Sequence, residues 1–176
     1  VCSSDLLHTA IANPFFSVGV QADLMNSDIN ALYISQSGIM MGDRDYYLDP
    51  ENENIRTAYK EYLGKLFRLA GIPEADIEKA VAGVMNIETK LAEKSWSNTE
   101  LRDIPAQYNP TAKAEFEKTY DAIDWPAYYK AMGIGDFDTI IVTTKSSIAN
   151  ANDLMKNAPL EDIRYYLAAQ DRKSVV

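Results

Sequence analysis

The side chains that most often bind catalytic metals or act as nucleophiles are scarce in this sequence. Its 176 residues include one histidine, His8, and one cysteine, Cys2, both close to the N-terminus. A catalytic zinc ion needs about three protein ligands, usually including imidazole or thiolate donors. Triads that depend on histidine or cysteine need partners for these residues as well. We therefore expect no catalytic residue, no metal site and no cofactor site in this chain.

The remaining candidates for chemistry are carboxylates. Asp43-Arg44-Asp45 could form an acid-base or metal cluster, but two carboxylates around an arginine favour an ion-pair network that fixes a loop. Asp121 and Asp124 could suggest the paired carboxylates of a glycosidase, a mechanism whose geometry cannot be read from spacing. We predict instead that Asp124 caps a helix.

Glu88 is a different case, because it falls on the apolar row of a predicted helix. That row contains Ile77, Val81, Val84 and Leu91. A buried carboxylate must be paired or neutralised. The nearby Arg102 is the predicted partner. The alternative is that Glu88 lies at the edge of the apolar face and reaches water.

Aromatic side chains could line a peptide-binding surface, because their rings bury area while tyrosine and tryptophan keep a polar group. Core and interface positions are the more common role of such residues. We therefore name no substrate-binding residue. The candidates are Tyr46, Tyr47, Trp96, Trp125, Tyr128, Tyr129, Tyr165 and Tyr166.

The elements that would position these residues begin with strands. Residues 15–23 and 29–36 are rich in strand formers, with Phe16, Val18 and Val20 alternating with small or polar residues. Asn26-Ser27-Asp28 between them is typical of a turn. The pattern predicts a β-hairpin.

Helices follow. Asp49 as cap, Pro50 in the first turn and an apolar face that ends at Gly71 predict one helix, and residues 73–94 predict a second that packs against it antiparallel. Further predicted elements are helices at 110–120 with Asn109 as cap, at 124–132 closed by Gly133, at 145–156 and at 159–169. Residues 139–143 could be a short strand or an extended buried segment. The expected fold class is mainly α, with a short β-hairpin near the N-terminus.

Composition limits the function. With 47% hydrophobic and 10% aromatic residues, the chain can bury the core of one domain or of a large part of one. A net charge of −9 without basic clusters argues against nucleic acid as a partner. No apolar stretch approaches the about 20 residues that span a bilayer.

Both ends of the chain have an unusual sequence. Residues 1–6 and 171–176 resemble translated sequencing adaptors. We expect both to be scars and residues 7–170 to be the native part.

The ordered motifs resemble the neprilysin and endothelin-converting-enzyme family of zinc metallopeptidases. The resemblance covers nearly all of residues 7–170 and is seen in Phe15-Phe16-Ser17-Val18-Gly19-Val20, Asn30-Ala31-Leu32-Tyr33-Ile34-Ser35-Gln36, Gly38, Gly42-Asp43-Arg44-Asp45-Tyr46-Tyr47-Leu48, Ile87-Glu88, Leu91-Ala92, Leu101-Arg102-Asp103, Tyr108-Asn109, Ile123-Asp124-Trp125, Tyr128, Pro159-Leu160 and Tyr166-Leu167. It breaks at Pro110-Thr111-Ala112-Lys113, where the family usually shows Lys-Met-Ser/Thr.

This resemblance implies that catalysis belongs to a different domain from the one in this sequence. The family's His-Glu-x-x-His motif, its further glutamate ligand and its Asn-Ala-Tyr type substrate segment lie in a C-terminal catalytic domain that this sequence lacks. The chain would be part of the helical N-terminal lobe of a two-lobed metallopeptidase, which faces the catalytic domain across a chamber for small peptides. It would be inactive alone, and the zinc would belong to the missing domain of a bacterial, periplasmic, cell-envelope or secreted parent.

One alternative remains open, a free-standing helical interaction domain without enzymatic activity. The fragment interpretation predicts a contiguous exposed patch of apolar side chains where the missing domain would pack.

Overall fold

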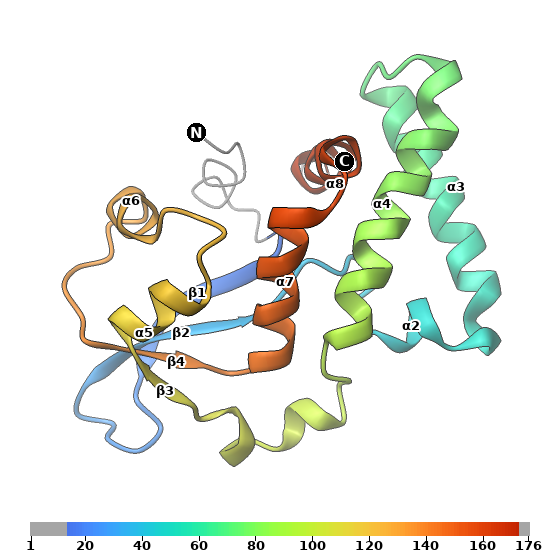
Figure 1. Ribbon diagram of the computed structural model, residues 1–176. Coiled ribbons are helices and arrows are strands. Elements are labelled where there is room, and N and C mark those ends of the chain that lie inside the picture. The colour runs from blue at the N-terminus through green and yellow to red at the C-terminus, as the bar shows by residue number, and fades with distance from the viewer. Residues whose placement is uncertain (1–13, 173–176) are drawn as a thin grey trace.

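The computed structural model describes residues 14–172, which form a small sheet beside a group of helices (Figure 1). The side chain of residue 172 is not described. His8 and Cys2 lie outside the described residues, as do residues 1–6 and 173–176 of the adaptor-like ends. The expected fold class, mainly α with an N-terminal β-hairpin, is confirmed.

The hairpin forms where the alternating pattern predicts it. β1 (Phe16–Ala22) pairs antiparallel with β2 (Asn30–Gln36), so that Phe16 lies opposite Gln36. The apolar face of β1 is buried only at its start. Phe16 is buried, whereas Val20 is 61% exposed, because the hairpin extends beyond the helices that cover its first half (Figure 1).

Two later strands complete the sheet in the order β1-β2-β4-β3. β4 (Thr139–Val142), the strand among the two alternatives for residues 139–143, pairs parallel with β2, with Leu32 opposite Ile140. β3 (Pro110–Ala112) pairs antiparallel with β4 at the edge of the sheet. Pairing between segments so distant in sequence holds the hairpin to the rest of the chain.

The helix predicted to start at Pro110 begins later, and this prediction is wrong in its first turn. Residues 110–112 are a strand, and α5 (Lys113–Thr119) follows directly. Asn109 does not cap it, because its Nδ2 donates to the carbonyl of Ala106 at 2.9 Å. A proline is tolerated in an edge strand, so the partner strand β4 decides the conformation here.

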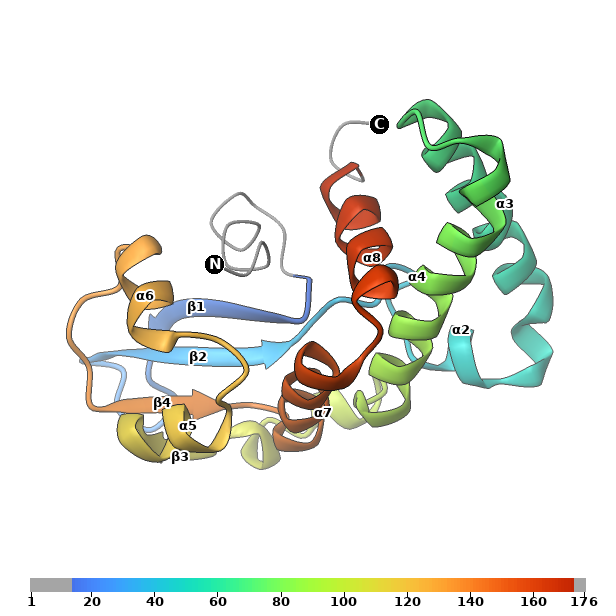
Figure 2. The ribbon, with the colours of Figure 1, turned by 45° about the horizontal axis from the view of Figure 1, so that its top comes forward.

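The predicted helix pair is confirmed as α3 (Glu53–Leu69) and α4 (Glu74–Lys94), which pack antiparallel (Figure 2). A short 3-10 helix, η1 (Pro50–Asn52), precedes α3, and the Asp49 side chain accepts from Glu51 N at its start. Gly71 has φ +80°, a left-handed conformation that favours glycine and ends α3.

The remaining helices connect the two halves of the molecule. α6 (Trp125–Ala131) lies over the sheet, and Asp124 accepts from Ala127 N at 3.0 Å, which confirms its predicted cap. α7 (Lys145–Asn157) and α8 (Leu160–Arg172) pack against α4. Short turns complete the chain: α2 (Asp45–Leu48), η2 (Glu100–Arg102) and η3 (Pro105–Gln107). Within residues 14–172, none of the helices has the length and apolar character needed to cross a membrane.

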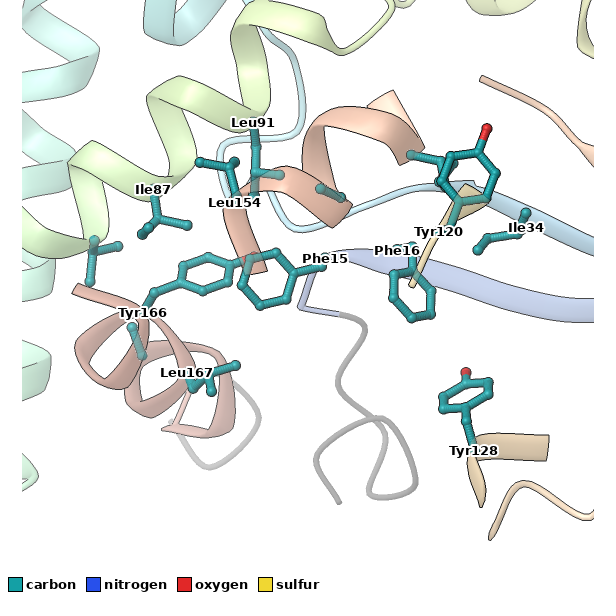
Figure 3. Close-up of a cluster of buried hydrophobic side chains, with 14 of the residues drawn as sticks. Phe15, Phe16, Ile34, Ile87, Leu91, Tyr120, Tyr128, Leu154, Tyr166 and Leu167 are labelled. Carbon is teal, nitrogen blue, oxygen red and sulfur yellow. The ribbon is translucent and has the colours of Figure 1, made fainter. Parts of the chain in front are cut away.

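One core runs through both halves. Figure 3 shows Ile87 and Leu91 of α4 near Tyr166 and Leu167 of α8, and Phe15 next to Tyr166. From Phe15 the core continues to Phe16, Tyr120 and Tyr128. Most of the eight candidate aromatics are core residues, with Tyr47, Trp125, Tyr128, Tyr129 and Tyr166 buried.

Candidate functional site

The most polar part of the core is a carboxylate-tyrosine cluster made of Glu88, Tyr47, Tyr59 and Tyr166. Glu88 is fully buried in α4. The Tyr47 hydroxyl donates to Glu88 Oε2 at 2.7 Å, and the Tyr59 hydroxyl lies 2.9 Å from Oε2 and 3.1 Å from Oε1. The Tyr47 hydroxyl in turn accepts from Met41 N at 3.0 Å. Tyr47 and Tyr59 therefore both donate to the buried carboxyl group of Glu88.

The electrostatics of this cluster favour neutral phenols. Burial, and then the charge of Glu88, raises the pKa of Tyr47 and the pKa of Tyr59 far above the ordinary value. The same two causes, in the same order, raise the pKa of Tyr166. A protonated phenol can donate a hydrogen bond to the carboxylate, whereas a phenolate would repel it. Protonated Tyr47 and Tyr59 can therefore both donate to the buried carboxyl group of Glu88.

Tyr166 ties the cluster to the start of the described chain. Its hydroxyl donates to the carbonyl of Pro14 and lies 2.9 Å from the carbonyl of Gly38. The same Gly38 carbonyl accepts from Gln170 Nε2 at 3.0 Å. The segments around Pro14, Gly38 and Gln170, distant in sequence, therefore meet at one point.

The predicted pairing of Glu88 with Arg102 is wrong. Glu88 is buried as predicted, but Arg102 lies exposed in η2, and none of the ion pairs among the described residues joins the two. The donors are instead hydroxyls from α2 and α3. Tyr59 on the apolar face of its helix was the available signal, because a phenol loses less solvation on burial than a guanidinium does.

Asp43-Arg44-Asp45 fixes a loop, as predicted, but its ion pair has another partner. Arg44 Nη1 donates to the carbonyl of Ser95 at 2.8 Å and lies 3.8 Å from Glu100. Asp43 accepts from the backbone N–H groups of Asp45 and Asn98. These contacts join the loop before α2 to the loop after α4.

Asp121 and Asp124 have different contact partners in the structure. Asp124 caps α6, and Asp121 lies 2.8 Å from Lys156 Nζ at the surface. The hydrogen bond from Lys156 lowers the pKa of Asp121. Both carboxylates therefore have structural partners.

An open groove lies between α3 and α4. Its volume is about 500 Å³, and charged side chains of both signs surround a floor that includes Gly64, Ile77 and Val81. One of the basic side chains, Arg68, is held by Glu74 at 2.6 Å. The mixed charge gives the groove no preference for one sign of ligand. The charged lining residues are Lys60, Glu61, Lys65, Arg68 and Glu78.

Four of the large exposed apolar side chains belong to the β1–β2 hairpin; that they form one contiguous patch, as the fragment interpretation predicts, stays a prediction. We call Val20, Leu24, Met25 and Ile29 the hairpin tip; they are 61%, 52%, 76% and 53% exposed. Other exposed apolar residues, such as Leu69 and Leu160, lie on separate helices.

Within residues 14–172, no three histidine, cysteine or acidic side chains are grouped so that they could hold a metal ion. The described residues therefore do not fit the zinc that the family resemblance implies, and we derive no step of peptide hydrolysis from them.

Comparison with known proteins identifies relatives along nearly the whole chain. The family model described as "Peptidase family M13", in its N-terminal part, matches residues 4–170. Endothelin-converting enzyme 1 of Mus musculus is 32% identical over 151 residues, which cover 82% of this chain and 20% of the mouse protein. The Homo sapiens enzyme is 33% identical, with 81% and 19% covered. The chain thus spans about a fifth of the length of these relatives.

Solved structures show the same fold. Zinc metalloprotease Zmp1 of Mycobacterium tuberculosis in its open state superposes with a TM-score of 0.86 at 23% identity, covering 94% of this chain and 26% of that protein. PepO of Lactobacillus rhamnosis gives a TM-score of 0.71 at 17% identity, covering 96% and 26%. The chain therefore belongs to peptidase family M13, the neprilysin and endothelin-converting-enzyme family of zinc metallopeptidases, and corresponds to the N-terminal region of that family.

Proposed function

We propose that this chain is a non-catalytic chamber segment of a neprilysin-like zinc metalloendopeptidase that hydrolyses small peptides. The observation that carries the proposal is the family match over residues 4–170 together with the chain's share of about a fifth of its relatives' length. The remaining four fifths of such a parent would contain the catalytic domain. In this proposal residues 7–170 are the native part of the chain.

The chain's own residues would act as a rigid wall. The carboxylate-tyrosine cluster joins α2, α3 and α4 around the buried side chain of Glu88. The aromatic rings around Trp125 hold α6 onto the sheet. A wall with a fixed shape limits the size of substrates that enter a chamber, and it needs no reactive group of its own.

Zinc, in this proposal, belongs to the remainder of the parent. When bound there, it would polarise the scissile carbonyl and activate water. No residue of this chain is assigned to the metal, to catalysis or to substrate. The fragment alone should be inactive, and the parent should work outside the cytoplasm, in the periplasm, at the cell envelope or as a secreted protein.

The test is to recover the complete gene and compare the full-length protein with the 176-residue chain. We expect the full-length protein to contain zinc, to cleave short peptides faster than folded proteins and to lose activity with a chelator. The 176-residue chain should show none of these properties. Metal analysis and a peptide-cleavage assay on both proteins measure the difference.

Two results would contradict the proposal. One is chelator-sensitive peptide cleavage by the purified 176-residue chain. The other is a gene that ends soon after residue 170, which would favour the free-standing interaction domain. Sequencing of the genomic locus across both ends also tests whether residues 1–6 and 171–176 are scars.

A further inference from the structure

The apolar face of β1 continues past the part of the molecule that covers it. Phe16, Val18 and Val20 alternate on one face, opposite Gln36, Ile34 and Leu32 of β2. Phe16 contacts the rings of Trp125 and Tyr128 in α6. Two residues beyond Val18, this cover ends and Val20 is exposed. This face of β1 is apolar over its whole length, but other parts of the described chain cover only its first half. The uncovered half is therefore a candidate contact surface.

The turn that follows is held in one conformation. Asp23 Oδ1 accepts from Met25 N at 2.7 Å and from Asn26 N at 3.1 Å, and the Asp23 backbone N–H donates to the carbonyl of Ile29 at 3.0 Å. Such contacts fix the path of the backbone through the tip.

Two tyrosines reach the turn from outside it. The Tyr108 hydroxyl donates to Asp23 at 3.0 Å, and the Tyr33 hydroxyl accepts from Leu24 N at 3.1 Å. Burial, and then the hydrogen bond to Asp23, raises the pKa of Tyr108. The Asp23 carboxylate and the backbone N–H of Leu24 thus have hydrogen-bond partners within the described chain, while the side chains of Leu24, Met25 and Ile29 are exposed to solvent.

We propose that the hairpin tip is a preformed docking element for the remainder of the same polypeptide. This inference rests on the proposed function. The solved structures that match 94–96% of this chain are about four times as long, so most of such a polypeptide lies outside the present chain. A rigid apolar tip loses little conformational entropy on packing, which suits a permanent contact within one chain.

The position of the tip agrees with this occupant. In Figures 1 and 2 the β1–β2 turn projects from the sheet at the end farthest from α3. It therefore lies away from the groove between α3 and α4. A domain that packs on the tip would cover the open end of the sheet and leave that groove accessible.

The test is oxidative footprinting of the full-length protein, with labelling of each residue compared between the native and the unfolded state. Leu69 at the end of α3, 78% exposed, is the internal control for Met25, 76% exposed. We expect Met25 and Leu24 to be protected several-fold in the native full-length protein, while Leu69 is labelled as in the unfolded protein. If the ratio of native to unfolded labelling is the same at Met25 and Leu24 as at Leu69, the inference is overturned.

Paired variants of the full-length protein add a second readout. Leu24→Ser with Met25→Ser should speed limited proteolysis between the N-terminal region and the remainder several-fold, whereas Leu69→Ser with Leu160→Ser should leave it unchanged. Tip protection that depends on protein concentration would indicate a second copy as the occupant and overturn the inference. Zinc-dependent peptidase activity without tip protection refutes this inference alone, and tip protection without that activity refutes the proposed function.

Discussion

The helical half of the molecule, around α3 and α4, and the sheet half, around β1–β4 and α6, have cores of different composition. The helical half places a carboxylate in its core and surrounds it with phenol donors from α2 and α3. The sheet half is filled by stacked and edge-on rings around Trp125, which contacts Phe16, Phe116, Tyr128 and Tyr129. Directional hydrogen bonds specify one arrangement, whereas apolar packing depends mainly on volume and shape. The helical half should therefore tolerate fewer substitutions at its centre.

The largest effect should come from the aromatic core. Trp125→Ala removes the ring at the centre of the sheet half and its hydrogen bond to the carbonyl of Tyr120. We expect the free energy of unfolding to fall by about 4 kcal/mol, the usual cost of such a cavity. Urea unfolding followed by circular dichroism measures it. Tyr46→Ala, at a partly exposed ring, is the control, and equal losses would refute the central role of Trp125.

The next effect concerns the buried carboxyl group of Glu88. Glu88→Ala leaves the hydroxyls of Tyr47 and Tyr59 without their shared acceptor, so we expect a loss of about 3 kcal/mol. Glu88→Gln keeps one acceptor oxygen and should cost less. Glu93→Ala, on the exposed side of the same helix, should change stability by less than about 0.5 kcal/mol. A Glu88→Ala loss no larger than this control would show that the cluster is not needed.

Alkaline pH should destabilise the protein through buried phenols in both halves, because burial raises the pKa of Tyr128 to about 12 and also raises the pKa of Tyr129. The pKa of Tyr47 and that of Tyr59 are raised on folding, so their contribution is fully present below the unfolded pKa of about 10 and is lost as pH rises above it. At pH 11 each phenol should lower the free energy of unfolding by about 1.4 kcal/mol. Tyrosine absorbance and urea unfolding between pH 8 and about 11 measure both changes. Phenols that ionise near pH 10 without loss of structure would contradict the donor role.

The smallest effect should lie at the surface between the halves. Lys156 lowers the pKa of Asp121, so this pair contributes above the unfolded pKa of the carboxyl and is lost as pH falls through the folded value. Lys156→Met should return the pKa of Asp121 to its ordinary range, as measured by NMR titration. Because the pair is exposed, we expect little change in stability. A pKa of Asp121 that does not move would assign the shift to another neighbour.

Local sequence patterns predicted where helices and strands lie better than they predicted which residues contact each other. The periodicity of residues 53–69 and 74–94 predicts α3 and α4, and the Asp49 and Asp124 caps follow from side-chain chemistry. The short strand at Pro110–Ala112 exists because β4 pairs with it, and no local signal carries that information. The partners of Glu88 lie 41 and 29 residues away, so proximity in sequence suggested Arg102 instead. The fragment interpretation predicts an exposed apolar patch, but no local signal in the sequence indicated that the exposed apolar residues would include those of the hairpin tip.

The meeting of Pro14, Gly38, Tyr166 and Gln170 restricts which residue can stand at position 38. The Tyr166 hydroxyl and Gln170 Nε2 of the last helix both bond to the segments that flank the β1–β2 hairpin, through the carbonyl groups of Pro14 and Gly38. Gly38 has φ +98°, and a methyl group there would collide with the backbone of Pro14. This junction therefore requires glycine at position 38, and through it the first described residue is joined to the last helix.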